Sequence, residues 1–451
     1  MITRIEAYRY RCFNAEGVGV DFGEYNMLAG RNGAGKTTLL DVPVLLGDML
    51  RSRICSDAFL KPQASWDTPR SHTLNELFFR EDGNQLTFVV EAKLPPEIVS
   101  KLTDTTDSNL QANEDLWPQY LRYELRLELF NNIELQVRNE HLFLYPEKYP
   151  TKPDFRKEGL LGTPTTVNPK SAPDMPHEYW LSVLHRGEGR PAIFSQEIED
   201  KHREKKNDPK RPITQMKIPA GQVALALLPP DGQLYPATNW FRNMLEQETV
   251  FFDPKWNTLR SASPPGNTAG ITTNGSSMPW LALELQKNDP QRFVRWVKHV
   301  KTGLRQVKAI RAVEREEDHH AYFVVTYEND YEVTSSGLSE GTLRLMALTL
   351  IPYLSVEHLP AHLVIEQPED GIHPRAIETV LDALKSIYDC QVWVSTQSPL
   401  VLAHTEVKDV LCASIEKDGS AQVVTGDNHP RLKDWKGSVD LGTLLATGVL
   451  G

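Results

Sequence analysis

The stretch GRNGAGKTT at residues 30–38 decides how the rest of the sequence is interpreted. It fits the pattern GxxxxGK[ST], in which a glycine-rich backbone closes around phosphate oxygens. The apolar residues 27–29 before it are typical of a short buried strand, and residues 39–46 after it carry apolar side chains at helical spacing. A strand, a glycine loop and a helix in this order predict a site for a nucleoside triphosphate.

Two side chains of this loop have distinct expected roles. Lys36 is expected to reach the β- and γ-phosphates, and the Thr37 hydroxyl is expected to bind Mg²⁺. Backbone N–H groups are expected to bind other phosphate oxygens, because the start of a helix carries a partial positive charge. The residues predicted to bind the nucleotide in this loop are Asn32, Gly33, Gly35, Lys36, Thr37 and Thr38.

Composition excludes several classes of protein. The chain has 451 residues and a net charge of −11, which argues against a protein that coats nucleic acid but allows a local basic region. No apolar run is long enough for a membrane span and the N-terminus is not a signal peptide, so we expect no membrane contact. The four cysteines form no CxxC pair, so we expect neither a zinc site nor a disulfide framework. A reduced, cytoplasmic location fits best.

Alternating apolar and polar residues predict strands in the first third of the chain. Strands are expected within residues 2–7 and 18–22, followed by a hairpin within residues 77–90. A second hairpin is expected within residues 123–137, with its turn at residues 131–132. Alternation is strict in this second hairpin, which predicts that one of its faces is solvated.

The middle of the chain differs in composition. Proline is frequent at residues 146–215, and Lys201–Arg211 is rich in basic residues. This basic segment fits a solvated surface insertion, or a loop that contacts a phosphate backbone or a partner protein. Residues 213–305 have a helical pattern, with Asp289 as one N-cap. The predicted parts of the chain are an N-terminal part at 1–150, a helical and loop insertion at 151–305, and a C-terminal part at 306–451.

A second group of motifs follows a β pattern at residues 305–335. LSEGT at residues 338–342 precedes an apolar-periodic helix. A buried strand at residues 362–365 ends in EQPED, and another at residues 392–394 ends in STQSP. One further strand is expected at residues 410–413.

In this order after a phosphate loop, these motifs resemble those of the ABC ATPase class. LSEGT resembles the LSGG-type signature, EQPED stands at the Walker B position, and STQSP stands at the end of the switch-histidine strand. The early hairpin and the β stretch at 119–146 resemble SMC/RecF-like, AAA15/AAA21-type ATPases, which include OLD-like proteins and ATPases of prokaryotic anti-phage systems. The resemblance implies an α/β fold, an ABC-type P-loop NTPase head with an N-terminal antiparallel β subdomain and a helical insertion.

The resemblance also implies that two copies of the chain share each nucleotide. Ser339 and Gly341 of the signature lie at the start of a helix, where the serine would face the γ-phosphate of ATP bound by a second copy, so a homodimer or a higher homo-oligomer is expected. Arg11 matches an arginine that lies near the nucleotide in this family. His373 is expected to be an interface residue between copies and not a metal ligand.

The Walker B and switch segments depart from the family pattern. Glu366 is expected to be the acidic Mg²⁺ ligand. The next position carries Gln367 where the family has the glutamate that polarises the attacking water, and an amide is a poor base. Gln397 stands in place of the switch histidine and can hydrogen-bond a γ-phosphate, but it cannot be protonated. Slow hydrolysis of ATP is therefore expected, with two alternatives: Glu369 serves as the base, or Gln367 is an engineered substitution.

Three functions follow from this resemblance. The sequence has no sustained coiled-coil heptads, and too few residues follow the switch strand for a nuclease domain. We therefore expect an ATPase that controls a separate effector protein, with a nuclease favoured, in bacterial anti-phage defence. The alternatives are a RecF-like DNA-repair ATPase that clamps duplex DNA, with contacts from Lys201–Arg211, and an ATP-bound scaffold without hydrolysis.

Overall fold

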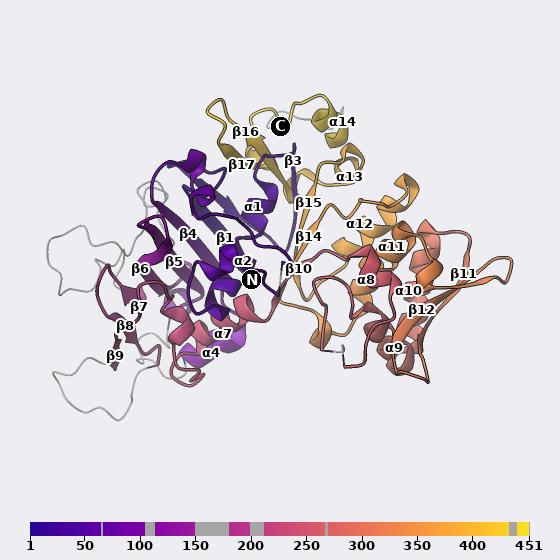
Figure 1. Ribbon diagram of the computed structural model, residues 1–451, viewed down its shortest axis with the longest axis horizontal. Coiled ribbons are helices and arrows are strands. Elements are labelled where there is room, and N and C mark those ends of the chain that lie inside the picture. Colours follow the sequence, from indigo (N-terminus) through magenta and orange to yellow (C-terminus); the bar gives the residue numbers. More distant parts are fainter. Residues whose placement is uncertain are drawn as a thin grey trace. The chain divides into compact units, whose positions relative to one another are not determined.

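The computed structural model describes residues 1–64, 66–103, 113–148, 180–198, 212–266, 269–432 and 440–450. The chain forms two compact units (Figure 1). Unit 1 contains Met1–Phe22, Asp41–Gln247 and Ile415–Val423, and unit 2 contains Gly23–Leu40, Glu248–Ser414 and Val424–Gly451. This division differs from three consecutive parts, because each unit is assembled from segments that are far apart in the sequence.

Unit 1 is built on an antiparallel sheet, whose described strands have the order β2-β1-β4-β5-β6-β7-β8-β9. These strands are β1 (Ile2–Tyr8), β2 (Val18–Asp21), β4 (Gln85–Lys93), β5 (Tyr120–Phe130), β6 (Glu134–Tyr145), β7 (Leu181–Arg186), β8 (Ala192–Ser195) and β9 (Ile213–Met216). The described helices are α2 (Val42–Arg51), α3 (Asp57–Leu60), α4 (Pro96–Thr103) and α7 (Pro236–Glu246). The two strands expected near the N-terminus are confirmed as β1 and β2, which pair with each other.

The two hairpins expected in this unit have different outcomes. The hairpin of β5 and β6 is confirmed, and its turn residues Asn131 and Asn132 have φ values of 50° and 57°. Such left-handed values suit a turn that joins two twisted strands. The hairpin expected within residues 77–90 is wrong, because its first arm forms short 3₁₀ turns. Arg80 and Glu81 have φ values of 56° and 54°, which interrupt an extended chain.

The prediction that one face of the β5–β6 hairpin is solvated holds only in part, because Arg126, Glu128, Glu134 and Gln136 are partly exposed but the polar face is buried towards the start of β5. Arg122 and Glu124 of β5 are polar residues, and both are fully buried. Arg122 Nε lies 2.6 Å from Glu124 Oε1, and Arg122 Nη1 lies 2.7 Å from Glu91 Oε1 of β4. Burial is tolerated because opposite charges compensate each other between neighbouring strands. An alternation of apolar and polar residues does not distinguish such a buried charged face from a solvated one.

The second sheet holds the phosphate loop and has the order β10-β14-β15-β3-β16-β17. Its strands are β3 (Tyr25–Gly30), β10 (Thr249–Phe252), β14 (His362–Glu366), β15 (Gln391–Thr396), β16 (Val410–Ile415) and β17 (Ala421–Thr425). Neighbouring strands from β10 to β16 are parallel. Because the carboxyl ends of parallel strands lie at one edge of a sheet, the segments that follow β3, β14 and β15 emerge close together.

Helices and a smaller sheet complete unit 2. Its described helices are α1 (Lys36–Leu40), α8 (Trp256–Arg260), α9 (Met278–Asn288), α10 (Pro290–Gly303), α11 (Glu340–Leu350), α12 (Ile377–Lys385), α13 (Pro399–Ala403) and α14 (Leu441–Ala446). The smaller sheet is antiparallel and confirms the β pattern at 305–335, with strands β11 (Val307–Glu314), β12 (Ala321–Tyr327) and β13 (Glu332–Thr334). The helical prediction for residues 213–305 is partly wrong, because β9 and β10 also lie there.

Local sequence explains where several of these elements begin. The expected N-cap of α10 is confirmed, since the Asp289 carboxylate accepts a hydrogen bond from the Arg292 N–H at 2.9 Å. Strand β15 is buried along its length, and Trp393 at its centre is 0% exposed. A strand buried on both faces fits a parallel sheet covered by helices. This apolar core fixes the strand ends that carry the polar residues of the site.

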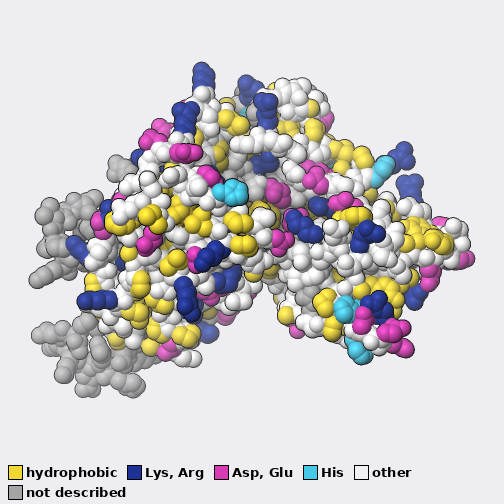
Figure 2. Space-filling view, viewed as in Figure 1, with side chains coloured by type: hydrophobic (Ala, Val, Ile, Leu, Met, Phe, Trp, Pro, Cys, Tyr) yellow, Lys and Arg dark blue, Asp and Glu magenta, His cyan; other side chains and the backbone are white. Residues whose placement is uncertain are grey.

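The surface carries mixed charge. On the face shown in Figure 2, lysine and arginine side chains are interspersed with aspartate and glutamate side chains over the described residues of both units. Among the described helices, none combines the length and the apolar character that a membrane span requires.

Candidate nucleotide-binding site

The phosphate loop leads from the end of β3 into α1. Gly33 and Gly35 have φ values of 79° and 82°, a left-handed conformation that glycine adopts without strain. Lys36 is 6% exposed and folds back over the loop. Its Nζ donates hydrogen bonds to the carbonyl oxygens of Gly30 at 2.8 Å and of Arg31 at 3.0 Å. The Lys36 ammonium group is thus held within the loop that is predicted to bind phosphate.

The end of β14 brings an acid to the phosphate loop. The Thr37 hydroxyl donates a hydrogen bond to the Glu366 carboxylate. Burial raises the pKa of Glu366, and the hydrogen bond from Thr37 opposes this shift. Burial lowers the pKa of Lys36, and the charges of Glu366 and Glu369 oppose that shift. A hydroxyl and a carboxylate in contact are hard oxygen donors, so Thr37 and Glu366 fit the Mg²⁺ ion that the resemblance implies.

Gln367 has an unusual backbone. Its φ value is 44°, which is uncommon for a residue other than glycine. Its N–H donates a hydrogen bond to the carbonyl oxygen of Ser395 at 2.9 Å, and its own carbonyl oxygen accepts one from Arg344 Nη2 at 3.4 Å. Arg344 belongs to α11 and is 8% exposed. Gln367 is therefore held in place by contacts to its backbone.

Glu369 is a half-buried acid beside the end of β15. Its Oε1 accepts a hydrogen bond from Thr396 Oγ1 at 2.6 Å, and its Oε2 is buried with no hydrogen-bond partner among the described residues. Burial raises the pKa of Glu369, while hydrogen bonds from Thr396 and from the Gln397 backbone oppose the shift. The Gln397 side chain itself is exposed at the strand end. A carboxylate with a raised pKa and an unused oxygen atom has the properties of a general base.

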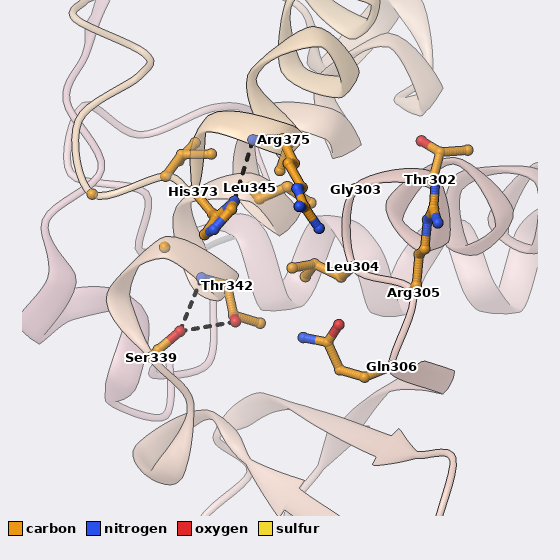
Figure 3. Close-up of a pocket in the computed structure, with 14 residues that line it drawn as sticks. Thr302, Gly303, Leu304, Arg305, Gln306, Ser339, Thr342, Leu345, His373 and Arg375 are labelled. Atoms are coloured by element: carbon orange, nitrogen blue, oxygen red, sulfur yellow. Dashed lines mark hydrogen bonds between the residues drawn. The ribbon is translucent and has the colours of Figure 1, made fainter.

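The signature segment begins helix α11. Ser339 is the N-cap of this helix, and its Oγ accepts a hydrogen bond from the Thr342 N–H at 3.3 Å. A Cβ atom at Gly341 would lie 2.3 Å from the carbonyl oxygen of Gly371, so this close contact requires glycine. Ser339 and Gly341 line a cavity of about 740 Å³, which His373 also lines (Figure 3). The signature segment and the residues after Walker B therefore share one open surface.

Arg11 and the segment Lys201–Arg211 were predicted to make contacts, and neither is among the residues that unit 2 brings together. Arg11 belongs to unit 1, where its guanidinium donates a hydrogen bond to the carbonyl oxygen of Arg70. Its φ value is 52°, so its backbone is left-handed as well. Lys201–Arg211, the segment expected to contact DNA or a partner, lies outside the described residues. The nucleotide role of Arg11 and the DNA contact stay predictions.

Sequence reasoning missed several residues of unit 2. Thr396 precedes Gln397 directly, so its place at a strand end was the available signal. No local signal connects Arg344 with Gln367, because the contact joins a helix to a distant strand end. Glu284, Glu357 and His358 were missed as well; their potential metal-ligand atoms lie within 4.8 Å of one another. Contacts of this kind depend on the fold and not on the spacing of residues in the chain.

The geometry of the loop and strand ends defines a class of protein. A phosphate loop whose threonine contacts a carboxylate at the end of a parallel strand is the arrangement of a P-loop nucleoside triphosphatase. Residues 170–403 match the family described as "AAA_21: AAA domain, putative AbiEii toxin, Type IV TA system". The chain belongs to this AAA_21 family, which confirms the AAA21-type recognition made from its motifs.

Solved structures that are similar to this chain include heads of SMC proteins. A Smc head bound to the C-winged helix domain of ScpA has a TM-score of 0.47 and 11% identity, over 94% of this chain and 96% of that chain. A Smc head with an extended coiled coil from Pyrococcus furiosus has a TM-score of 0.47 and 10% identity, over 94% and 95% of the two chains. The SMC head domain from Thermotoga maritima has a TM-score of 0.38 and 9% identity, over 94% and 98%. No curated protein matches the sequence.

Proposed function

We propose that the chain binds ATP together with Mg²⁺ and hydrolyses ATP slowly. The observation that carries this proposal is the hydrogen bond from Thr37 to Glu366, whose charge also acts on Lys36. Position 367, directly after this acid, carries an amide. Lys36 would neutralise charge on the β- and γ-phosphates. Thr37 and Glu366 would hold Mg²⁺, which supplies further positive charge to the phosphate oxygens when it is bound.

Glu369 is the proposed base of this slow reaction. The oxygen of a water molecule forms a bond to the γ-phosphorus, while the bond from that phosphorus to the β–γ bridging oxygen breaks and ADP leaves. The water must give a proton to a base, and the Gln367 amide is too weak for this. Burial of Glu369, its raised pKa and its unpartnered Oε2 among the described residues support its role as the proton acceptor.

In this proposal two copies of the chain close on ATP, each with its signature segment on the nucleotide of the other. The exposed Ser339 and the open cavity beside it support this arrangement, since both are accessible to a second copy. The closed pair would control a separate effector protein, with a nuclease favoured, in anti-phage defence. The family description names a toxin and a TA system, which supports action together with another protein.

Changes at Lys36 and Gln367 test the nucleotide site. Lys36→Ala is expected to weaken ATP binding at least about tenfold, because it removes a charged hydrogen-bond donor to phosphate. Gln367→Glu is expected to raise turnover about a hundredfold, because it supplies a carboxylate at the water-polarising position. Titration calorimetry measures ATP binding, and phosphate release at saturating ATP measures turnover.

The outcomes of these measurements separate the alternatives. A wild-type rate that equals the rate of Gln367→Glu contradicts the proposal that Gln367 slows hydrolysis. Binding of ATP without turnover in either chain favours the non-hydrolysing scaffold. Retention of full ATP affinity by Lys36→Ala contradicts the assignment of the phosphate loop.

A negative charge in the signature segment tests the shared nucleotide. Ser339→Glu is expected to prevent ATP-dependent pairing of two copies, because its carboxylate would repel the triphosphate of the second copy. Ser336→Glu is the matched control, since Ser336 is also exposed and lies three residues earlier. Light scattering with a non-hydrolysable ATP analogue measures the mass. Pairing by wild type and Ser336→Glu but not by Ser339→Glu supports the arrangement, and pairing by all three contradicts it.

A further inference from the structure

The cavity beside the signature segment has a wall of basic and polar side chains. It measures about 740 Å³ and lies among the C-terminal end of α10, the start of α11 and residues 371–376 (Figure 3). Arg305, Arg375 and His373 line it, and none of its lining residues is acidic. A concave surface with cationic groups and no carboxylate favours an anionic ligand.

The two arginines occupy different sides of this cavity. In Figure 3, Arg375 lies next to His373 and directs its guanidinium into the space between His373 and Leu304, while Arg305 lies on the other side beside Thr302. Arg375 is exposed, and within the described residues its guanidinium has no hydrogen bond or ion pair. Its backbone is fixed, because the Arg375 N–H donates a hydrogen bond to His373 Nδ1 at 3.2 Å. The side chain is thus anchored at its base and free to bind at its tip.

The neighbours of Arg375 indicate which anion it meets. Ser339 and Gly341 line the same cavity, and in the proposed function they face the triphosphate of a second copy. A guanidinium binds phosphate oxygens through two parallel N–H groups, so it suits a triphosphate better than a single hydroxyl or amide does. This chain has Gln397 where the family has a histidine, so the side chain at the switch position brings no positive charge to the nucleotide.

We propose that Arg375 binds the triphosphate of the nucleotide held by a second copy of this chain, in the cavity beside Ser339. This inference rests on the proposed function, because it requires ATP in the phosphate loop and two copies that close on it. Arg375 then completes each nucleotide site with a cation from the opposite copy. In the single chain the Arg375 guanidinium is exposed, and in the closed pair it binds the triphosphate.

Pairing in the presence of a non-hydrolysable ATP analogue gives the first test. Arg375→Ala is expected to raise the protein concentration at half-maximal pairing about tenfold to a hundredfold, since it removes a charge-assisted contact to phosphate. Arg305→Ala removes the same charge from the other side of the cavity and is expected to change this concentration less than about twofold. Arg375→Lys, which keeps the charge, is expected to lie between Arg375→Ala and wild type. Equal effects of Arg375→Ala and Arg305→Ala would show a non-specific field and overturn the proposal.

Mixing of variants gives the second test, because it shows on which copy Arg375 acts. Arg375→Ala and Lys36→Ala are each expected to turn over ATP poorly when alone. In a mixed pair, Lys36 from one copy and Arg375 from the other complete one nucleotide site, so the mixture is expected to regain turnover. The same mixture with Ser339→Glu in place of Arg375→Ala tests the proposed function itself. Recovery with Ser339→Glu but not with Arg375→Ala overturns only the role of Arg375, whereas recovery in neither mixture overturns the shared site.

Arg375 could also meet the triphosphate of free ATP instead of ATP held by a second copy. One measurement distinguishes these two sources. The Lys36→Ala chain is kept at a concentration where it stays single, and ATP is titrated into it. The single Lys36→Ala chain is expected to bind no ATP in the cavity beside Ser339. Binding of free ATP that disappears in the double variant Lys36→Ala, Arg375→Ala would place a nucleotide in the cavity of a single chain and overturn the proposal.

Discussion

Glu369→Gln is expected to reduce ATP turnover about a hundredfold or more, while ATP binding stays unchanged. The glutamine amide has nearly the shape of the carboxylate, and its oxygen can still accept the hydrogen bond from Thr396 Oγ1, which is 2.6 Å long in the wild type. It cannot accept a proton from water. Lys36, Thr37 and Glu366 are untouched, so the affinity for ATP isolates the chemical step from binding.

Asp370→Asn is the matched control for this change. Asp370 is the adjacent carboxylate and is exposed. Asp370→Asn therefore removes the same charge and leaves Glu369 in place. Turnover of Asp370→Asn is expected to stay within about twofold of wild type. Wild-type turnover by Glu369→Gln, or an equal loss in both variants, means that Glu369 is not the base.

The pH dependence of wild-type turnover provides an independent check on Glu369. Burial raises the pKa of this carboxyl from its ordinary value of 4.5. A general base acts in its ionised form, so turnover is expected to fall as the pH falls through the raised pKa, at a pH above 4.5. Turnover that is constant down to pH 4.5 in a folded chain contradicts this assignment. Circular dichroism at each pH establishes that the chain is folded.

Arg122→Ala is expected to lower the free energy of unfolding of unit 1 by about 3–5 kcal/mol. Arg122 is 0% exposed and lies 2.7 Å from Glu91 and 2.6 Å from Glu124, with Glu6 at 3.5 Å. Burial alone would raise the pKa of Glu6, but the charges of Arg122 and Arg4 outweigh it and the pKa is lowered. Without Arg122, buried carboxylates lose their main compensating charge. Amide hydrogen exchange of β4 and β5 measures the change locally.

Two further variants show whether charge is the cause. Arg138→Ala is the matched control, because Arg138 of β6 also pairs with glutamates but its side chain is 26% exposed. The expected loss there is about 1 kcal/mol or less. Adding Glu91→Gln and Glu124→Gln to Arg122→Ala is expected to restore part of the lost stability, because fewer buried charges are left unpaired. No recovery would indicate that the loss comes from the cavity left by the arginine side chain.

The phosphate loop was predictable residue by residue, because its chemistry requires glycine, lysine and a hydroxyl at fixed positions in one continuous segment. Glu366 was predictable for a related reason: an apolar strand that ends in an acid places that acid at the edge of a parallel sheet. The structure places Glu366 at the end of β14, in contact with Thr37, and its role as a Mg²⁺ ligand stays a prediction. Motif order then sufficed for the family, since Walker A, signature and Walker B positions occur in sequence.

The rest could not be predicted because it depends on contacts between distant segments. Nothing near Glu369 in the sequence shows that Thr396 would donate a hydrogen bond to it. The alternation in β5 indicated a solvated face, but Arg122 is buried between two carboxylates that compensate its charge, Glu124 of the same strand and Glu91 of β4. The composition of the chain likewise does not show that each compact unit is assembled from three separate segments.

The place of β3 in its sheet has a consequence for the synthesis of the chain. Ala29 of β3 pairs with Thr396 of β15 on one side and with Cys412 of β16 on the other. A ribosome adds roughly 5–20 residues per second, so the phosphate-loop sequence exists for tens of seconds before its two neighbouring strands emerge. During that time β3 has neither of the strands that pair with its two edges in the folded sheet. A nascent chain that contains the phosphate-loop sequence therefore lacks the sheet around it until residues 391–415 have been synthesised.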